Sequence, residues 1–206
     1  MKTLERGFKA WAERTSKQLR SEVGVRLDAP LAPQVVAKYL GVRLITPREV
    51  EGMPADDLDQ LLRADPWGWS AVSHTVDGQA VVIYNPRHSQ GRGASNLMHE
   101  LAHFLLAHDE GRIILSEDGT IVMRSYDQKQ EEEAAWLAYC LLLPREALMA
   151  CRKRGLTNGQ IADEYGVSEK LVEFRLRDCG VDAQLRAGTK RWSKPHSAVG
   201  QKPHHG

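Results

Sequence analysis

Cysteine is scarce in this sequence, and the cysteines present do not form pairs. The three residues Cys140, Cys151 and Cys179 are odd in number, far apart and outside any C-x-x-C motif. Secreted disulfide scaffolds carry even sets of cysteines, and cysteine zinc knuckles need closely spaced pairs. The pattern therefore excludes both and indicates reduced thiols of a cytoplasmic protein.

Long apolar runs are also missing. The opening stretch, MKTLERGFKAW, has no apolar core of the kind that marks a secretory signal peptide. No run of 18 apolar residues occurs anywhere, so the sequence predicts no membrane span. We expect a cytoplasmic protein.

A charge excess of one sign is the third absence. The 28 Lys and Arg residues nearly balance the 27 Asp and Glu residues, which leaves a net charge of +1. Global charge therefore predicts neither a nucleic-acid nor a membrane partner. A length of 206 residues, 42% of them hydrophobic, fits one soluble domain with room for a small appendage.

The chemistry of the chain is concentrated in the stretch NLMHELAHFLLAH, residues 96–108. It contains the motif His99-Glu100-Leu101-Ala102-His103. Residues four apart lie about 40° apart around a helix, so both imidazoles can meet one metal ion. Zinc accepts two imidazole nitrogens and a carboxylate and leaves one position for water, whose proton Glu100 can take.

An amphipathic helix with two surface histidines is the alternative interpretation of this motif. Apolar residues surround the motif almost completely, which is typical of a buried core helix. Buried imidazoles and a buried carboxylate need a partner, and a metal ion supplies one.

Two β-rich runs precede this helix, at residues 69–76 and 80–85. They are joined across Asp77-Gly78, a strong hairpin signal. A strand just ahead of the metal helix could form an edge to which an extended substrate peptide adds, although a purely structural hairpin is an equal alternative. Residues 87–94 are expected to form a loop, and 113–123 a second hairpin or a long loop.

Helices are predicted on both sides of these elements. The expected segments are residues 4–23 (a solvated helix with one apolar stripe), 33–40, 58–62, 128–143 and 148–154. A short strand is expected at 42–46.

The third metal ligand is not given by the motif itself. The chain does not continue as H-E-x-x-H-x-x-G-x-x-H, and His108, five residues beyond His103, would point about 140° away around the helix. Glu131, Glu132 and Glu133 open the helix at 128–143, where acids also favour a helix N-terminus for electrostatic reasons. Spacing favours Glu131, on the same side as the expected core residues Ala135, Ala138 and Leu142, and keeps Glu133 as its rival.

These segments resemble the ImmA/IrrE zinc metallopeptidases. The resemblance rests on HELAHFLLAH, EEEAAWLAYCLLLPREAL and RGLTNGQIADEYGVSEKLVEFRL, in that order, and covers residues 65–178 best. It implies a minimal zincin fold and a site-specific protease that cuts a repressor. It also implies zinc ligands His99, His103 and Glu131, the last thirteen residues before Pro144, with Glu100 as the general base. The family often has Asn four residues after this glutamate, where this chain has Ala135.

The third quoted segment looks like a helix-turn-helix around Gly166-Val167-Ser168. Four acids outnumber Lys170, Arg175 and Arg177 between residues 156 and 177. DNA binding depends on cations that neutralise phosphates, so we expect a structural hairpin or a partner-docking surface. The basic tail that follows has the composition of a mostly disordered segment.

Together these features predict an α+β protein in three parts: a zincin-like metallopeptidase domain (1–155), a helix-turn-helix-like extension (156–180) and a basic tail (181–206). The expected activity is hydrolysis of a protein substrate, such as a helix-turn-helix repressor, with one Zn²⁺. His74 and Tyr126 are candidates to steady the oxyanion. Two alternatives are a regulatory DNA-binding protein with a structural zinc site and a zincin fold that only binds a partner.

Overall fold

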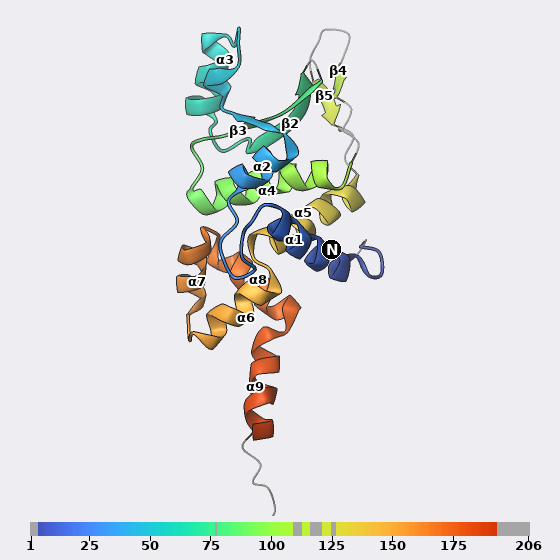
Figure 1. The fold of residues 1–206 in the computed structure, drawn as a ribbon. Coiled ribbons are helices and arrows are strands. Elements are labelled where there is room, and N and C mark those ends of the chain that lie inside the picture. The colour runs from blue at the N-terminus through green and yellow to red at the C-terminus, as the bar shows by residue number, and fades with distance from the viewer. Residues whose placement is uncertain (1–3, 77, 109–112, 116–120, 125–126, 193–206) are drawn as a thin grey trace, which may run out of the picture.

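The computed structural model describes residues 4–76, 78–108, 113–115, 121–124 and 127–192. The predicted α+β class is confirmed (Figure 1). The elements before the metal motif are α1 (Phe8–Glu22), α2 (Pro33–Leu40), β1 (Arg43–Ile45), η1 (Pro47–Glu49), α3 (Ala55–Asp59), η2 (Gln60–Ala64), β2 (Ala71–Val76) and β3 (Gln79–Tyr84). Those that follow are α4 (Gln90–Leu105), β4 (Ile113–Leu115), β5 (Ile121–Arg124), α5 (Gln128–Leu142), α6 (Arg145–Lys153), α7 (Asn158–Tyr165), α8 (Glu169–Cys179) and α9 (Val181–Trp192).

The predicted hairpin is present and belongs to a three-stranded sheet in the order β1-β3-β2. β2 runs antiparallel to β3, with Ser73 opposite Val82, and β1 runs parallel to β3. The strand directly ahead of the metal helix, β3, is therefore central and not an edge. The outer strand that contacts α4 is β2.

A second, two-stranded sheet follows α4. β4 and β5 are antiparallel with an irregularity between Ile114 and Leu115. The hairpin alternative for residues 113–123 is therefore confirmed, while the turn itself, residues 116–120, lies outside the described residues.

Helix α4 begins at Gln90, so the loop expected at 87–94 is mostly helical. The glycines in this stretch had suggested a loop, but Gly91 has a packing role. A Cβ atom at Gly91 would lie only 3.0 Å from the carbonyl carbon of Val167 and 3.2 Å from the amide nitrogen of Ser168. The missing side chain lets the turn between α7 and α8 lie directly against α4.

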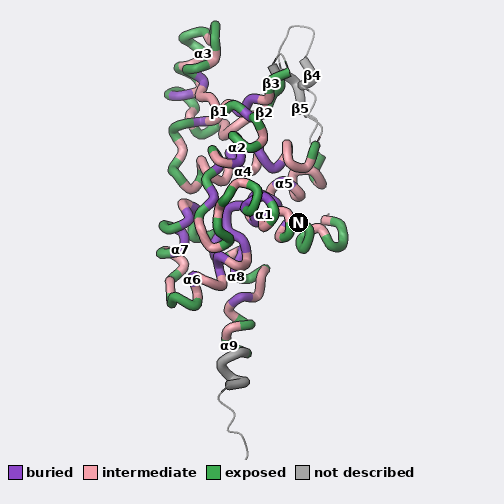
Figure 2. Tube along the Cα trace, in the orientation of Figure 1, coloured by how far each residue is buried: buried purple, intermediate pink, exposed green. Residues whose placement is uncertain are grey.

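Helix α5 is the centre of the hydrophobic core (Figure 2). Ala134, Leu137, Ala138 and Leu141 are fully buried on it, whereas Ala135, expected on the core face, is only half-buried. The helical segment 128–153 is long and apolar enough, by length and composition, to cross a membrane, but 67% of its most apolar window is buried inside the protein. That burial is typical of a core helix.

The prediction that α1 is a solvated helix is wrong on one side, where two of its polar side chains are buried against the carboxyl end of α5. Arg20 on α1 is fully buried and donates to the carbonyl oxygen of Leu141 at 2.8 Å and to that of Ala29 at 2.6 Å. The Ser16 hydroxyl donates to Cys140 O at 2.7 Å, and Arg175 Nε on α8 donates to Leu143 O at 3.1 Å. The last carbonyls of a helix have no partner within it, and here side chains of α1 and α8 supply the hydrogen-bond donors.

The segment after α8 was expected to be disordered from its start, and this is wrong for its first part. Val181 is fully buried at the beginning of α9, and Leu185 packs against the core. Asp182 pairs with Arg152 on α6 at 3.0 Å. These contacts order α9, and residues 193–206 lie outside the described part of the chain.

The cysteines match the prediction of unpaired thiols. Burial raises the pKa of Cys179 to about 11 and also raises the pKa values of Cys140 and Cys151. All three are therefore protonated at neutral pH, which makes them poor nucleophiles and poor metal ligands.

Candidate metal centre

Three side chains from α4 and α5 converge on one point. Nε2 of His99 lies 3.0 Å from Oε2 of Glu131 and 3.1 Å from Nε2 of His103, and Nε2 of His103 lies 3.5 Å from Oε1 of Glu131. The histidines are one helical turn apart on α4, and Glu131 occupies the first turn of α5, whose N-cap is Asp127. Among the described residues, these three form a group that could hold a metal ion.

The spacing of these donor atoms suits zinc. Tetrahedral ligands about 2.0–2.1 Å from Zn²⁺ lie roughly 3.3 Å from one another. The observed separations of 3.0, 3.1 and 3.5 Å lie on both sides of that value. Two imidazole nitrogens with one carboxylate also match the ligand set of zinc hydrolases, so these three side chains fit a zinc ion.

The group is partly open to solvent, which corrects the expectation of a completely buried helix. Leu97, Met98, Leu101 and Ala102 are buried on one face of α4. The opposite side is less covered, and the side chains of His99, His103 and Glu131 are 26%, 18% and 37% exposed. The donor atoms are therefore not sealed off by the described residues.

Glu100 is oriented by the sheet. Its Oε2 accepts a hydrogen bond from the Ser73 hydroxyl on β2 at 2.7 Å. Ser73 was not predictable from the sequence, because a serine in a strand carries no local signal and the contact joins residues 27 positions apart. The strand thus fixes the carboxylate of the residue that directly follows His99.

His108 lies close to His103, contrary to the helical-wheel argument. Helix α4 ends at Leu105, so the angle of 140° does not apply. Nδ1 of His108 lies 3.0 Å from Nδ1 of His103, and its Nε2 lies 3.3 Å from Oε2 of Glu133. Glu133, the rival for third ligand, therefore contacts His108, and Glu131 faces the histidine pair.

Of the two oxyanion candidates, the structure describes His74. His74 is exposed on β2, and because side chains alternate along a strand, it leaves the sheet on the face opposite Ser73. Tyr126 lies outside the described residues.

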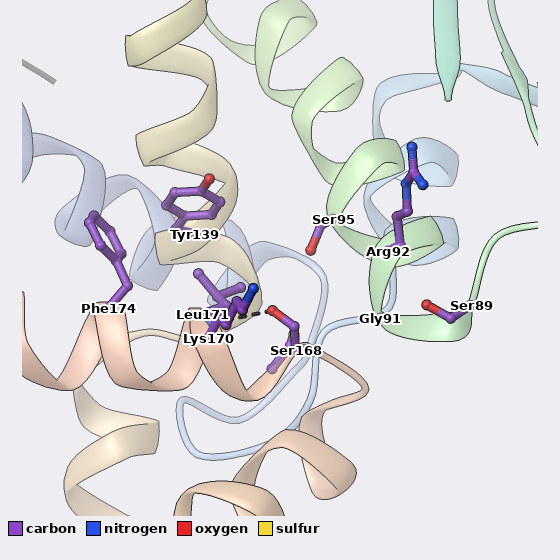
Figure 3. Close-up of a pocket in the computed structure, with 10 residues that line it drawn as sticks. Ser89, Gly91, Arg92, Ser95, Tyr139, Ser168, Lys170, Leu171 and Phe174 are labelled. Carbon is purple, nitrogen blue, oxygen red and sulfur yellow. Dashed lines mark hydrogen bonds between the residues drawn. The ribbon is translucent and has the colours of Figure 1, made fainter. Parts of the chain in front are cut away.

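A separate groove of about 710 Å³ lies where α8 meets α4 and α5 (Figure 3). Arg92 and Ser95 of α4, Tyr139 of α5 and Lys170 of α8 are among its lining residues. None of the three candidate ligands lines it. The groove shows that the start of α8 faces α4 and α5.

Comparisons with known proteins assign this arrangement to a family. Residues 37–177 match the peptidase M78 family, described as an IrrE N-terminal-like domain. A solved structure of a Mycobacterium tuberculosis transcriptional regulator is similar with a TM-score of 0.47 and 17% identity, over 84% of this chain and 47% of that one. No curated protein matches. Because the match spans more than half of the sequence and contains every residue of the candidate centre, the chain belongs to the ImmA/IrrE family of peptidase M78 proteins.

Proposed function

We propose that this protein is a zinc-dependent endopeptidase that binds one Zn²⁺ through His99, His103 and Glu131, with Glu100 as its general base. The observation that carries the proposal is the convergence of His99, His103 and Glu131 on one point. The carboxylate of Glu100, the residue after His99, is oriented by Ser73 and supports it. The family places the chain among metallopeptidase-like proteins, which agrees with this chemistry.

Each residue has a defined task in peptide hydrolysis. When bound, the metal ion would acidify a water molecule and polarise the peptide carbonyl. Glu100 takes the proton of the attacking water and can pass it to the leaving amine. Ser73 donates to Oε2 of Glu100 and so limits the rotation of that carboxylate. Partial exposure of the histidines leaves room for the scissile bond.

The substrate we propose is an extended segment of a regulatory protein, such as a helix-turn-helix repressor, in the cytoplasm. β2 is one of the two outer strands of its sheet, and its residue Ser73 contacts Glu100. A peptide aligned with β2 would therefore pass beside the general base, as in recognition by strand addition. The choice of a repressor rests on the resemblance of the sequence to ImmA/IrrE proteases.

A structural zinc site in a DNA- or partner-binding protein is the second candidate function. Structural zinc is held by four protein ligands, whereas catalytic zinc keeps one position open. The candidate group contains three ligands among the described residues. This donor set favours the enzyme.

The decisive test is Glu100→Gln, which keeps the shape of the side chain and removes the proton acceptor. We expect cleavage of a candidate repressor to fall about 10²–10⁴-fold, with zinc content and thermal stability unchanged because no ligand is lost. His99→Ala is the matched control and should lower zinc content and stability together, since bound metal stabilises the folded state. Equal cleavage by wild type and Glu100→Gln at equal zinc occupancy would refute the mechanism.

A further inference from the structure

The chain reverses direction at the end of α4 and carries His108 back toward the metal centre. The amide of Ala107 donates to Phe104 O at 3.2 Å, and the amide of His108 donates to His103 O at 3.1 Å. Ala107 has φ +49°. Paired bonds of this kind around a left-handed residue form a Schellman motif. The motif places His108 directly beside the ligand His103.

The residue in the left-handed position is unusual. Glycine normally occupies it, and alanine there costs on the order of 1 kcal/mol or more. Ala107 is the only non-glycine residue with positive φ in the described part of the chain. Strain of this kind persists only where surrounding contacts maintain it, and the contacts of His108 are the ones that this turn creates.

His108 connects the metal ligand to a carboxylate through both of its ring nitrogens. Its Nδ1 lies 3.0 Å from Nδ1 of His103, and its Nε2 lies 3.3 Å from Oε2 of Glu133. The side chains of His108 and Glu133 are only 8% and 13% exposed. Water is therefore a poor substitute for either contact.

The carboxylate sets the direction of both hydrogen bonds. A carboxylate only accepts, so Nε2 of a neutral His108 must carry the hydrogen and donate to Glu133. Nδ1 of His108 is then an acceptor, and Nδ1 of His103 must donate to it. His103 is left with a lone pair on Nε2, the nitrogen that faces His99 and Glu131.

We propose that His108 and Glu133 are positioning residues that hold His103 in the tautomer and ring orientation required for metal binding. The inference rests on the proposed metal site and names the residues that support it. Lys129 lies 3.9 Å from Oε1 of Glu133 and also pairs with Glu5. Lys129 thus keeps a positive charge near the Glu133 carboxylate, which contacts His108 and through it His103.

The test compares two variants of equal size at position 108. Asn retains an acceptor oxygen where Nδ1 of His108 lies, whereas Leu has the same shape without an acceptor. Outer-shell partners of metal-ligating histidines typically contribute about 10–100-fold in metal affinity. We expect His108→Leu to weaken zinc affinity of the full chain by that factor, and His108→Asn to restore most of it. A competition titration with a chromophoric zinc chelator measures both.

A second readout separates positioning from packing. Nitrogen-15 NMR of metal-free protein should show the His103 hydrogen on Nδ1 in wild type and His108→Asn, and a mixture of tautomers in His108→Leu. Glu133→Gln should give the same mixture of tautomers with the ring of His108 in place. This variant tests the inference independently if the variants at position 108 do not fold. Equal zinc affinity of wild type, His108→Leu and Glu133→Gln would overturn the inference, as would equal losses in the Asn and Leu variants. Failure of wild type to bind zinc would instead refute the proposed function.

Discussion

Glu131, Glu132 and Glu133 are adjacent carboxylates in the first turns of α5, and they have different partners. Oxygens of Glu131 lie 3.0 and 3.5 Å from the two histidines, while Oε1 of Glu132 accepts from Gln128 on the same helix. Side chains of successive residues leave a helix about 100° apart, so one turn presents three carboxylates in three directions. Position on the helix therefore decides which one can bind metal.

At this scale, we expect Glu131→Ala to remove most of the bound zinc, because one of three protein ligands is lost. Glu132→Ala is the matched control and should retain full occupancy. Metal analysis of the purified proteins after dialysis against weak chelator checks the prediction. Full occupancy of Glu131→Ala would exclude it as a ligand.

Ser73 is the second residue with a separable effect. Ser73→Ala should lower kcat about 10–100-fold, since a hydrogen bond to a charged group contributes about 1.5–3 kcal/mol. Zinc content should not change. Ser73→Thr retains the hydroxyl and should recover activity in the same peptide-cleavage assay, whereas failure of this rescue would assign the loss to strand packing.

At the scale of the element, the end of α4 stores backbone strain. Ala107→Gly should stabilise the protein by about 1 kcal/mol, because glycine adopts positive φ without steric cost. For a chain of this size, that corresponds to an increase in Tm of about 2–4 °C. Ala10→Gly, at an exposed position in α1, is the control and should instead lose about 0.5–1 kcal/mol. Calorimetry of both variants decides, and a lower Tm for Ala107→Gly would contradict the argument.

The carboxyl end of α5 depends on a hydrogen-bond donor from α1, the guanidinium of Arg20. Burial lowers the pKa of Arg20 to about 10, so its guanidinium remains charged at neutral pH. Arg20→Met should destabilise the fold by about 3 kcal/mol or more, because several buried carbonyls, including that of Leu141, lose their donor. Arg14→Met on the exposed side of α1 should change the free energy of unfolding by less than about 0.5 kcal/mol. Similar denaturation midpoints for the two variants would rule out this role.

At the scale of the whole molecule, α7 and α8 are part of the same core as α4 and α5, which carry the candidate metal ligands. Ile161 and Val172 are fully buried in the cluster that includes α5. The turn before α8 lies against Gly91 of α4, and Arg175, one of the few cations of α8, is fully buried and paired with Glu13. A recognition helix reads DNA with its first residues, and here the α7–α8 turn that leads into α8 is packed on another helix.

We therefore expect α8 to contribute no DNA affinity. Replacing its exposed cations in a Lys170→Glu, Arg177→Glu double variant should leave binding to duplex DNA by the full chain unchanged at every salt concentration. Fluorescence anisotropy measures this. Reduced affinity with a smaller salt slope in the variant would show that α8 does contact phosphates.

The local part of this protein was predictable from its sequence. The H-E-x-x-H spacing predicted that His99 and His103 share one face, because residues one helical turn apart do so whatever the rest of the chain does. It also proposed Glu100 as the general base, which remains a prediction. The Asp-Gly hairpin and the helix 33–40 followed from equally local rules. Spacing put Glu131 only modestly ahead of Glu133, and the resemblance to a family also favoured Glu131.

Other features were decided only by the tertiary structure. Ser73, His108 and Arg20 act through residues on other elements, so no periodic pattern in the sequence identifies them. One of the two glycines that suggested a loop, Gly91, serves helix packing. The cations expected on a solvated face include a fully buried one, Arg20. A polar side chain pairs with whichever backbone group or carboxylate the fold brings to it, and a glycine allows whichever element the fold packs against it. Both partners are known only once distant elements are packed together.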